Sequence, residues 1–290
     1  MNPSGPRRLV RAALTSSLAT ALAGTLVLVA PTGADARRHQ PDPRLTPRTH
    51  FVMAPDGSTG LTASGERIPN IDSVKATIRR YYNASRDGIA DKTSSPYITE
   101  MTRIEAEQQA YLDRAYRQAV AAGERPALVF DADDTTLWTY DMEDGAMKFN
   151  FDPALQDVWV QDQRFPATPG MGRVVRAAQA GGCKVVGLTG RNDNQRAATI
   201  ANLNKYYDGA FTDGLYFTKW TGVGASQQPS YIHCATAKCT TIEYKSQTRR
   251  HIERDLHLRI VGNFGDQFSD LIGGYADRTY KLPNPTYYLP

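Results

Sequence analysis

Four acidic residues follow two apolar runs of the sequence, two after each run: Asp131, Asp133, Asp266 and Asp270. Carboxylates gathered in one cleft would repel each other unless a cation lay among them. Oxygen ligands without clustered His or Cys favour a hard ion, and magnesium fits better than calcium or zinc. Such an ion offsets the repulsion between a carboxylate and a phosphate. These residues therefore predict a magnesium site at which a carboxylate could attack a phosphate.

The elements that would position these residues are short apolar runs with helical patterns between or before them. The runs lie at 127–130, 184–188, 214–217 and 259–262, and the helical patterns lie at about 72–85, 97–122, 171–180, 193–206 and 243–256. Apolar strands joined by helices predict an α/β fold with a Rossmann-like, doubly wound parallel sheet covered on both faces. Because ligands of such sheets bind beyond the carboxyl ends of the strands, the acidic residues should meet at one mouth.

A further polar cluster, Thr189-Gly190-Arg191, ends the second run and completes a set of four motifs. In chain order these are Asp131-x-Asp133-x-Thr135, Leu188-Thr189-Gly190-Arg191, a helical Lys before the last core strand, and Gly262-Asn263-Phe264-Gly265-Asp266-x-x-x-Asp270. Lys245 matches the third motif best, with Lys219 and Lys238 as nearby alternatives. The set resembles the haloacid dehalogenase superfamily of aspartate-nucleophile phosphohydrolases, which implies that fold and a small cap inserted after the first strand.

The later motifs resemble one group within that superfamily, the class B acid phosphatases and plant vegetative storage proteins. The resemblance is carried by residues 260–263, 265–267 and 269–271 and by Tyr280-Lys281-Leu282-Pro283-Asn284-Pro285-Thr286-Tyr287-Tyr288. It covers about 97–290. It implies an acid phosphatase-like hydrolase of phosphoric monoesters.

The resemblance also implies a role for each matching residue. Asp131 would be the nucleophile that forms an aspartyl-phosphate, Asp133 the general acid and base, and Lys245 the cation that neutralises Asp131 and the phosphoryl group. The magnesium ligands would be Asp131, Asp133 through its backbone carbonyl, Asp266 and Asp270. The substrate contacts would be Thr135, Thr189, Gly190 and Arg191. Arg191 could equally form a salt bridge at a helix start, and Asp134 is expected to be solvated or to act as a cap.

The segment at about 138–169 is long for a strand–helix connection and corresponds to the cap. It is rich in aromatic residues: Trp138, Tyr140, Phe149, Phe151 and Trp159. These rings could stack on a nucleoside or aryl leaving group, or they could simply pack the cap.

The N-terminus has the features of an export signal. Three arginines precede an apolar stretch at 14–30, and Ala34 and Ala36 are small residues of the kind that a signal peptidase reads. The stretch is short and interrupted for a stable membrane span. We therefore expect a signal peptide at 1–36, cleavage after Ala36, and a secreted protein. Residues 37–70 are predicted to form a flexible arm, and residues 71–290 the phosphatase domain.

The charge of the chain is nearly balanced. The net charge is +4, and without the leader 31 basic residues face 29 acidic ones. This balance argues against a protein that coats nucleic acid or an anionic membrane, and a small phosphorylated molecule is the expected partner.

The chain has three cysteines. Cys234 and Cys239 bracket a short polar segment, so a local disulfide is plausible in an oxidising compartment. Cys183 starts an apolar run and should be a buried thiol. A zinc site is disfavoured because only His233 lies near the pair.

Three functions are compatible with the motifs. The first is a secreted phosphomonoesterase that uses Mg²⁺. The second is a phosphotransferase that passes the same aspartyl-phosphate to an alcohol. The third is a storage or binding protein on the same fold, which the intact Asp131 and Asp133 disfavour. A receiver-type signalling domain is disfavoured by the leader and by the cap insertion.

Overall fold

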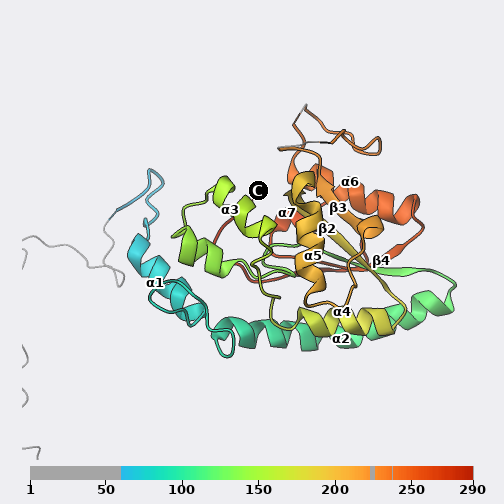
Figure 1. The fold of residues 1–290 in the computed structure, drawn as a ribbon, viewed down its shortest axis with the longest axis horizontal. Helices are drawn as coiled ribbons and strands as arrows, with labels where there is room; N and C mark the ends of the chain where they lie inside the picture. The colour runs from blue at the N-terminus through green and yellow to red at the C-terminus, as the bar shows by residue number, and fades with distance from the viewer. Residues whose placement is uncertain (1–59, 223–225, 237, 290) are drawn as a thin grey trace, which may run out of the picture. The chain divides into compact units, whose positions relative to one another are not determined.

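The computed structural model describes residues 60–222, 226–236 and 238–289, and within them a five-stranded parallel sheet forms the centre of the fold (Figure 1). Its strands are β1 (Pro126–Phe130), β2 (Lys184–Asn192), β3 (Tyr216–Lys219), β4 (Arg259–Gly265) and β5 (Thr279–Lys281). Their order across the sheet is β3-β2-β1-β4-β5, and every neighbouring pair is parallel. The chain reverses its direction of winding at β1, so β4 lies next to β1. The acidic residues that follow these two strands therefore lie close to one another.

Helices cover both faces of this sheet. Along β1 the side chains alternate: Leu128 and Phe130 pack into one core, whereas Ala127 and Val129 pack into the other. The first core includes residues of α2 (Pro96–Ala121), α4 (Met171–Ala180) and α5 (Arg196–Asn204), and the second includes residues of α6 (Thr241–Arg254). Figure 1 shows α2 and α4 along one side of the strands and α6 on the other. A strand buried on both faces needs apolar residues at every position, which explains the uninterrupted run at 127–130.

The remaining helices are short. They are α1 (Ile71–Tyr81), α3 (Pro153–Gln161), α7 (Phe268–Leu271), a π-helix η1 (Asp141–Ala146) and the 3₁₀ turns η2 (Asp193–Gln195) and η3 (Asp213–Leu215). Side-chain caps set the starts of several helices. The Asn70 side chain accepts from the backbone at the start of α1, and Ser95 accepts from Ile98 N at the start of α2. Thr240 and Glu243 form a reciprocal capping box at the start of α6.

The predicted elements are confirmed with shifted ends. β2 continues to Asn192 and β4 to Gly265, so both strands run into the polar residues that follow the apolar runs. The third strand is 216–219 rather than 214–217, because residues 213–215 form η3. The helix expected at 72–85 ends at Tyr81, and the pattern at 193–206 divides into η2 and α5. β5 was not predicted, since in its three residues only Tyr280 is buried and no periodic pattern forms.

The segment at 138–169 connects β1 to α4 and contains η1 and α3. Trp138 and Tyr140 do not face a ligand cavity but pack in the core against tyrosines of the N-terminal helices. The ring centroids of Tyr97 and Trp138 lie 5.1 Å apart, and those of Tyr82 and Tyr140 lie 4.0 Å apart. For these two rings the packing alternative is therefore correct.

The predicted signal peptide at 1–36 and most of the predicted arm lie outside the described residues. Residues 60–70 form a short turn in which Leu61 and Arg67 make an antiparallel bridge. No helix in the described ranges is long and apolar enough to cross a membrane. Cys234 and Cys239 form a disulfide with a Cα–Cα distance of 5.1 Å. Cys183 is buried, and burial raises the pKa of its thiol to about 12.

Candidate active site

An ion-pair cluster lies at the carboxyl end of the sheet. Asp131 directly follows β1, Asp270 lies in α7 after β4, and Lys245 projects from the second turn of α6. The Lys245 ammonium contacts Oδ1 of Asp131 at 2.5 Å and Oδ1 of Asp270 at 2.6 Å. Burial alone would lower the pKa of Lys245, but the two carboxylates raise it above its usual value, so the side chain is a fixed cation. This contact selects Lys245 over Lys219 and Lys238 as the lysine paired with Asp131.

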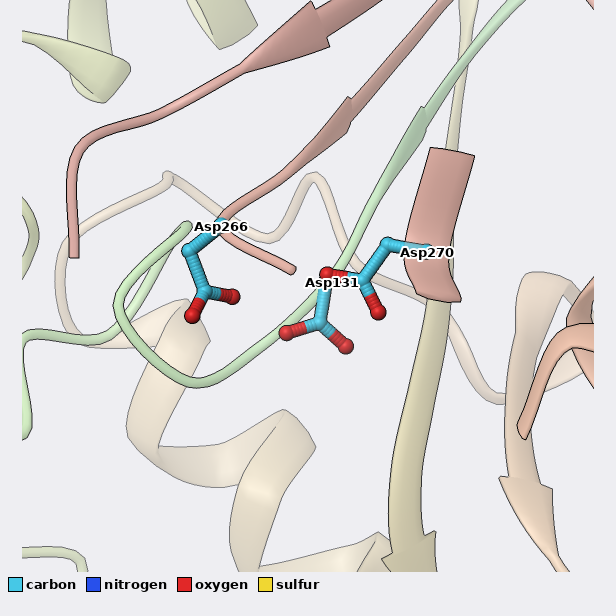
Figure 2. A group of neighbouring side chains, drawn as sticks. All are labelled: Asp131, Asp266 and Asp270. Atoms are coloured by element: carbon cyan, nitrogen blue, oxygen red, sulfur yellow. The ribbon is translucent and has the colours of Figure 1, made fainter. Parts of the chain in front are cut away.

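A third carboxylate completes an acidic cluster. Oxygens of Asp131, Asp266 and Asp270 all lie within 4.8 Å of one another. Figure 2 shows the three side chains together, Asp131 and Asp266 just after their strands and Asp270 on α7. Gly265 permits this approach, because a Cβ there would lie only 2.6 Å from Oδ2 of Asp270. Of the four acidic residues expected to meet at this mouth, the structure brings these three together, whereas the carboxylate of Asp133 pairs with Arg191.

The negative charge of this cluster exceeds the positive charge of Lys245, which favours binding of a further cation. Burial, reinforced by the neighbouring aspartates against the opposing effect of Lys245, raises the pKa of Asp131 well above its usual value. Burial and then repulsion from Asp270 raise the pKa of Asp266 to about 7. One lysine does not compensate three buried carboxylates, whereas a divalent cation would. The donor set is made of carboxylate oxygens, which fits a hard ion such as Mg²⁺.

Asp133 lies apart from the acidic cluster, although it lines the same cavity. Its carboxylate is held by Arg191, with Nη2 at 2.6 Å from Oδ1 and Nε at 3.1 Å from Oδ2. The Arg191 side chain is 1% exposed, and its Nη1 also donates to Oγ1 of Thr199 at 2.9 Å. The structure thus shows Arg191 in a salt bridge with the predicted acid and base, whereas a contact of Arg191 with substrate stays a prediction.

The other predicted substrate contacts are placed differently. Gly190 is exposed and lines the cavity beside Arg191. Thr189 is fully buried, and its hydroxyl accepts from the backbone N–H of Arg191 at 3.2 Å. Thr135 is also buried, with its hydroxyl 3.4 Å from Oδ1 of Asp266. In this structure the two threonines therefore support neighbouring site residues and do not line the cavity wall.

Of the two expectations for Asp134, a solvated residue or a cap, the structure shows the cap. It is 1% exposed and therefore not solvated. Its carboxylate accepts from the backbone N–H of Thr139 at 3.1 Å and from the Thr139 hydroxyl at 2.5 Å. Asp134 has a positive φ of 49°, and its side chain closes the turn that follows Asp131 and Asp133. Burial raises the pKa of Asp134 to about 7.

Two amides orient Asp266, and sequence reasoning gave neither of them a role. Oδ2 of Asp266 accepts from Nε2 of Gln267 at 2.6 Å and from Nδ2 of Asn284 at 2.7 Å. The two amides occupy Oδ2 of Asp266. Within the described residues, Oδ1 accepts one long hydrogen bond, from the Thr135 hydroxyl at 3.4 Å. Both amides belong to the motifs on which the family resemblance rests, and this membership was the signal by which the sequence could have identified them.

Arg249 is a further residue that the sequence did not single out. It is fully buried in α6 and donates to three backbone carbonyls of the loop that follows Asp270. These are the carbonyls of Asp270 at 2.6 Å, Ile272 at 2.6 Å and Gly274 at 2.8 Å. Burial lowers the pKa of Arg249 to about 10. The arginine holds the loop, and with it Asp270, against α6.

The acidic cluster opens into a cavity of about 440 Å³. One wall comes from the segment between β1 and α4 and includes Glu143, Phe149 and Phe151, and another comes from residues 286–289. The hydroxyl of Ser269 and the side chain of Gln267 hydrogen-bond the backbone of Leu289, which ties this second wall to the acidic loop. The cavity is large enough for a small phosphate ester.

Comparison with known proteins agrees with this geometry. The model of the HAD superfamily, subfamily IIIB (acid phosphatase), matches residues 79–290. The chain belongs to this family. The family recognised from the four motifs is thus confirmed, and the match begins somewhat earlier than residue 97.

Two curated plant proteins are similar to this member of subfamily IIIB. The Stem 28 kDa glycoprotein of Glycine max is 32% identical over 186 residues, which cover 63% of this chain and 66% of that protein. Acid phosphatase 1 of Solanum lycopersicum is 32% identical over 179 residues, which cover 60% and 64%. This chain thus spans just under two thirds of the length of each relative.

A solved structure shares the fold of this subfamily IIIB chain. The class C acid phosphatase from Bacillus anthracis with tungstate bound aligns with a TM-score of 0.52 and 21% sequence identity, covering 68% of this chain and 81% of that chain. At this level of identity the likeness concerns the fold alone. It agrees with the parallel α/β sheet predicted from the sequence.

Proposed function

We propose that this protein is a Mg²⁺-dependent phosphomonoesterase of the acid phosphatase type, exported by its leader, with Asp131 as the nucleophile. The observation that carries this proposal is the contact of Lys245 with both Asp131 and Asp270 at the end of the sheet. A buried carboxylate beside a fixed cation and an acidic cluster is suited to attack on a dianionic phosphate, because the positive charges offset the repulsion. The family and the acid phosphatase among its relatives support the same activity.

In the first step an Asp131 oxygen would attack phosphorus, the P–O bond to the leaving group would break, and Asp133 would give its proton to the departing oxygen. In the second step Asp133 would take a proton from water, and the resulting hydroxide would displace Asp131 from phosphorus. Inorganic phosphate is then released, and Asp133 is protonated again. The position of Asp133 on the cavity wall supports this role, and Arg191 fixes the orientation of its carboxylate.

Asp131, Asp266 and Asp270 would hold Mg²⁺, with the backbone carbonyl of Asp133 as the further predicted ligand. When bound, Mg²⁺ supplies positive charge that neutralises the carboxylates and the phosphoryl oxygens. Lys245 would neutralise Asp131 and a phosphoryl oxygen, and Gly190 lets the backbone come close to the phosphate.

The test is the purified protein with a panel of phosphomonoesters. Asp131→Asn should abolish turnover, because the amide is a poor nucleophile, while circular dichroism and the melting temperature stay close to wild type. EDTA should stop the wild-type reaction and added Mg²⁺ should restore it. Substantial turnover by the variant, or activity indifferent to EDTA, would overturn the proposal. N-terminal sequencing of protein recovered from the medium should begin at Arg37.

A further inference from the structure

Glu143 is a buried carboxylate whose position the reaction above leaves unexplained. It lies in the π-helix η1, is 6% exposed, and lines the active-site cavity. No hydrogen bond or ion pair to its carboxylate exists within the described residues. Its carboxylate oxygens are not among the fully enclosed unpaired atoms of the described residues, so they open onto the cavity, where a bound group would meet them.

The two other acids of η1 differ from Glu143 in this respect. Asp144 is held by Arg79 through two bonds of 2.7 Å and by the hydroxyl of Tyr140 at 2.9 Å. Asp141 accepts from Lys92 at 2.8 Å and from the backbone of Ala90 at 2.9 Å. The fold therefore pairs the acids of η1 that face the protein and leaves unpaired the one that faces the cavity. π-Helices frequently occur at functional sites.

The surroundings of Glu143 indicate which part of a substrate it would meet. Burial and then repulsion from Asp133 raise the pKa of Glu143 to about 7, and Glu143 in turn contributes to the raised pKa of the buried Asp134. Lys245 and the acidic cluster mark the phosphate end of the cavity, whereas Asp133 marks the ester oxygen. Glu143, Phe149 and Phe151 all come from the wall between β1 and α4, so they border the space for the leaving group.

We propose that Glu143 selects leaving groups that carry a hydrogen-bond donor, either a hydroxyl or an ammonium, a few bonds from the ester oxygen. The inference rests on the proposed phosphomonoesterase function and narrows its substrates to phosphate esters of polyols or amino alcohols. The bound donor supplies the partner that the carboxylate lacks in the protein. A purely alkyl leaving group would leave Glu143 unpaired, and an anionic one would repel it.

The experiment compares kcat/KM at pH 8, above the pKa of about 7 of Glu143, for propyl phosphate, glycerol 1-phosphate and phosphoethanolamine, with 4-nitrophenyl phosphate as a general substrate. The wild type should favour a donor-bearing ester over propyl phosphate by about 10- to 100-fold, the effect expected of a hydrogen bond to a charged group. Glu143→Leu should remove this preference. Glu143→Gln keeps an acceptor oxygen but loses the charge, so it should spare the glycerol ester and lose phosphoethanolamine.

The outcomes separate the two donors. Selective loss of phosphoethanolamine in Glu143→Gln identifies an ammonium, whereas a preference that survives in Gln and disappears in Leu identifies a hydroxyl. Glu107→Gln is the matched control: this carboxylate is 54% exposed on α2, pairs with Arg103, and should give the wild-type pattern. Glu143→Leu should also melt at or above the wild-type temperature, because it removes an unpaired buried acid. A purely structural role predicts a lower melting temperature.

Two results would overturn the inference. An equal change in kcat/KM for all four esters would mean that Glu143 does not read the leaving group, and unchanged preferences would mean that it contacts nothing there. If the wild type hydrolyses 4-nitrophenyl phosphate with Mg²⁺ in either case, only the assignment of Glu143 fails. If it hydrolyses none of the four esters, the proposed function fails as well.

Discussion

Replacing Arg191 by lysine tests whether this arginine orients Asp133, the proposed general acid, or contacts the phosphate of the substrate. Lysine keeps the positive charge but loses the planar fork. In the structure that fork makes two bonds to Asp133, at 2.6 and 3.1 Å, and a third to Thr199 at 2.9 Å. A lysine ammonium at the same place can retain at most one of the two bonds to the carboxylate, so Asp133 would no longer be held in one orientation.

The size of the effect follows from the bond that is lost. A hydrogen bond to a charged group contributes about 1.5–3 kcal/mol. At about 1.4 kcal/mol per tenfold change in rate, its loss corresponds to a fall of about 10- to 150-fold. This fall in kcat/KM should appear with substrates whose leaving oxygen must be protonated as it departs. An alkyl phosphate should therefore lose about this factor in kcat/KM, whereas 4-nitrophenyl phosphate, whose leaving group departs as a stable anion, should lose much less.

The assay is steady-state kinetics on both esters for the wild type, Arg191→Lys, Asp133→Asn and the double variant. If Arg191 acts through Asp133, the lysine substitution should cost little more once Asp133 is already asparagine. Equal losses on the alkyl and aryl esters, additive with Asp133→Asn, would refute this reasoning and place Arg191 on the phosphoryl group. Melting temperatures of all four proteins separate these effects from unfolding.

Two predictions concern the metal site. Asn284→Ala removes one of the two amides that orient Asp266, so the Mg²⁺ concentration for half-maximal activity should rise about 10-fold while kcat at saturation changes little. Gln109→Ala is the control, because it removes an amide that bonds Asp113 on α2, outside the cavity lining, and it should behave as wild type. An unchanged Mg²⁺ requirement in Asn284→Ala would contradict the role. The second prediction follows from burial, which raises the pKa of Asp131 and brings that of Asp266 to about 7. The folded metal-free protein then keeps protons that the unfolded chain loses above about pH 4, so its stability should fall as the pH rises from about 4 to 7. Calorimetry should therefore find a larger Mg²⁺-induced rise in melting temperature at pH 7.5 than at pH 5, and an equal or smaller rise would count against the acidic cluster as the metal site.

The fold and the acidic cluster were predictable because their signals are local. A strand buried on both faces must be apolar throughout, so the runs at 127–130 and 259–262 were visible in the sequence. Asp131 and Asp266 are placed by the ends of β1 and β4, whereas Asp270 lies in α7 and is also held by Arg249 of α6. β5 was not predicted because it lacks such a local signal: a three-residue strand with one buried side chain shows no periodic pattern.

Which polar side chains pair with one another was decided only by the tertiary structure. Arg191 and Asp133 are 58 residues apart, and their contact depends on how β2 lies beside β1. The same holds for Asn284, which reaches Asp266 because the chain returns along β5 to the acidic loop. Glu143 is the clearest case: in sequence it is one of three acids in a short segment, and only packing distinguishes the unpaired one. The sequence alone identified the residues that can do the chemistry. Their hydrogen-bond and ion-pair partners come from segments far apart in the chain, and no local sequence pattern shows which of these segments pack together.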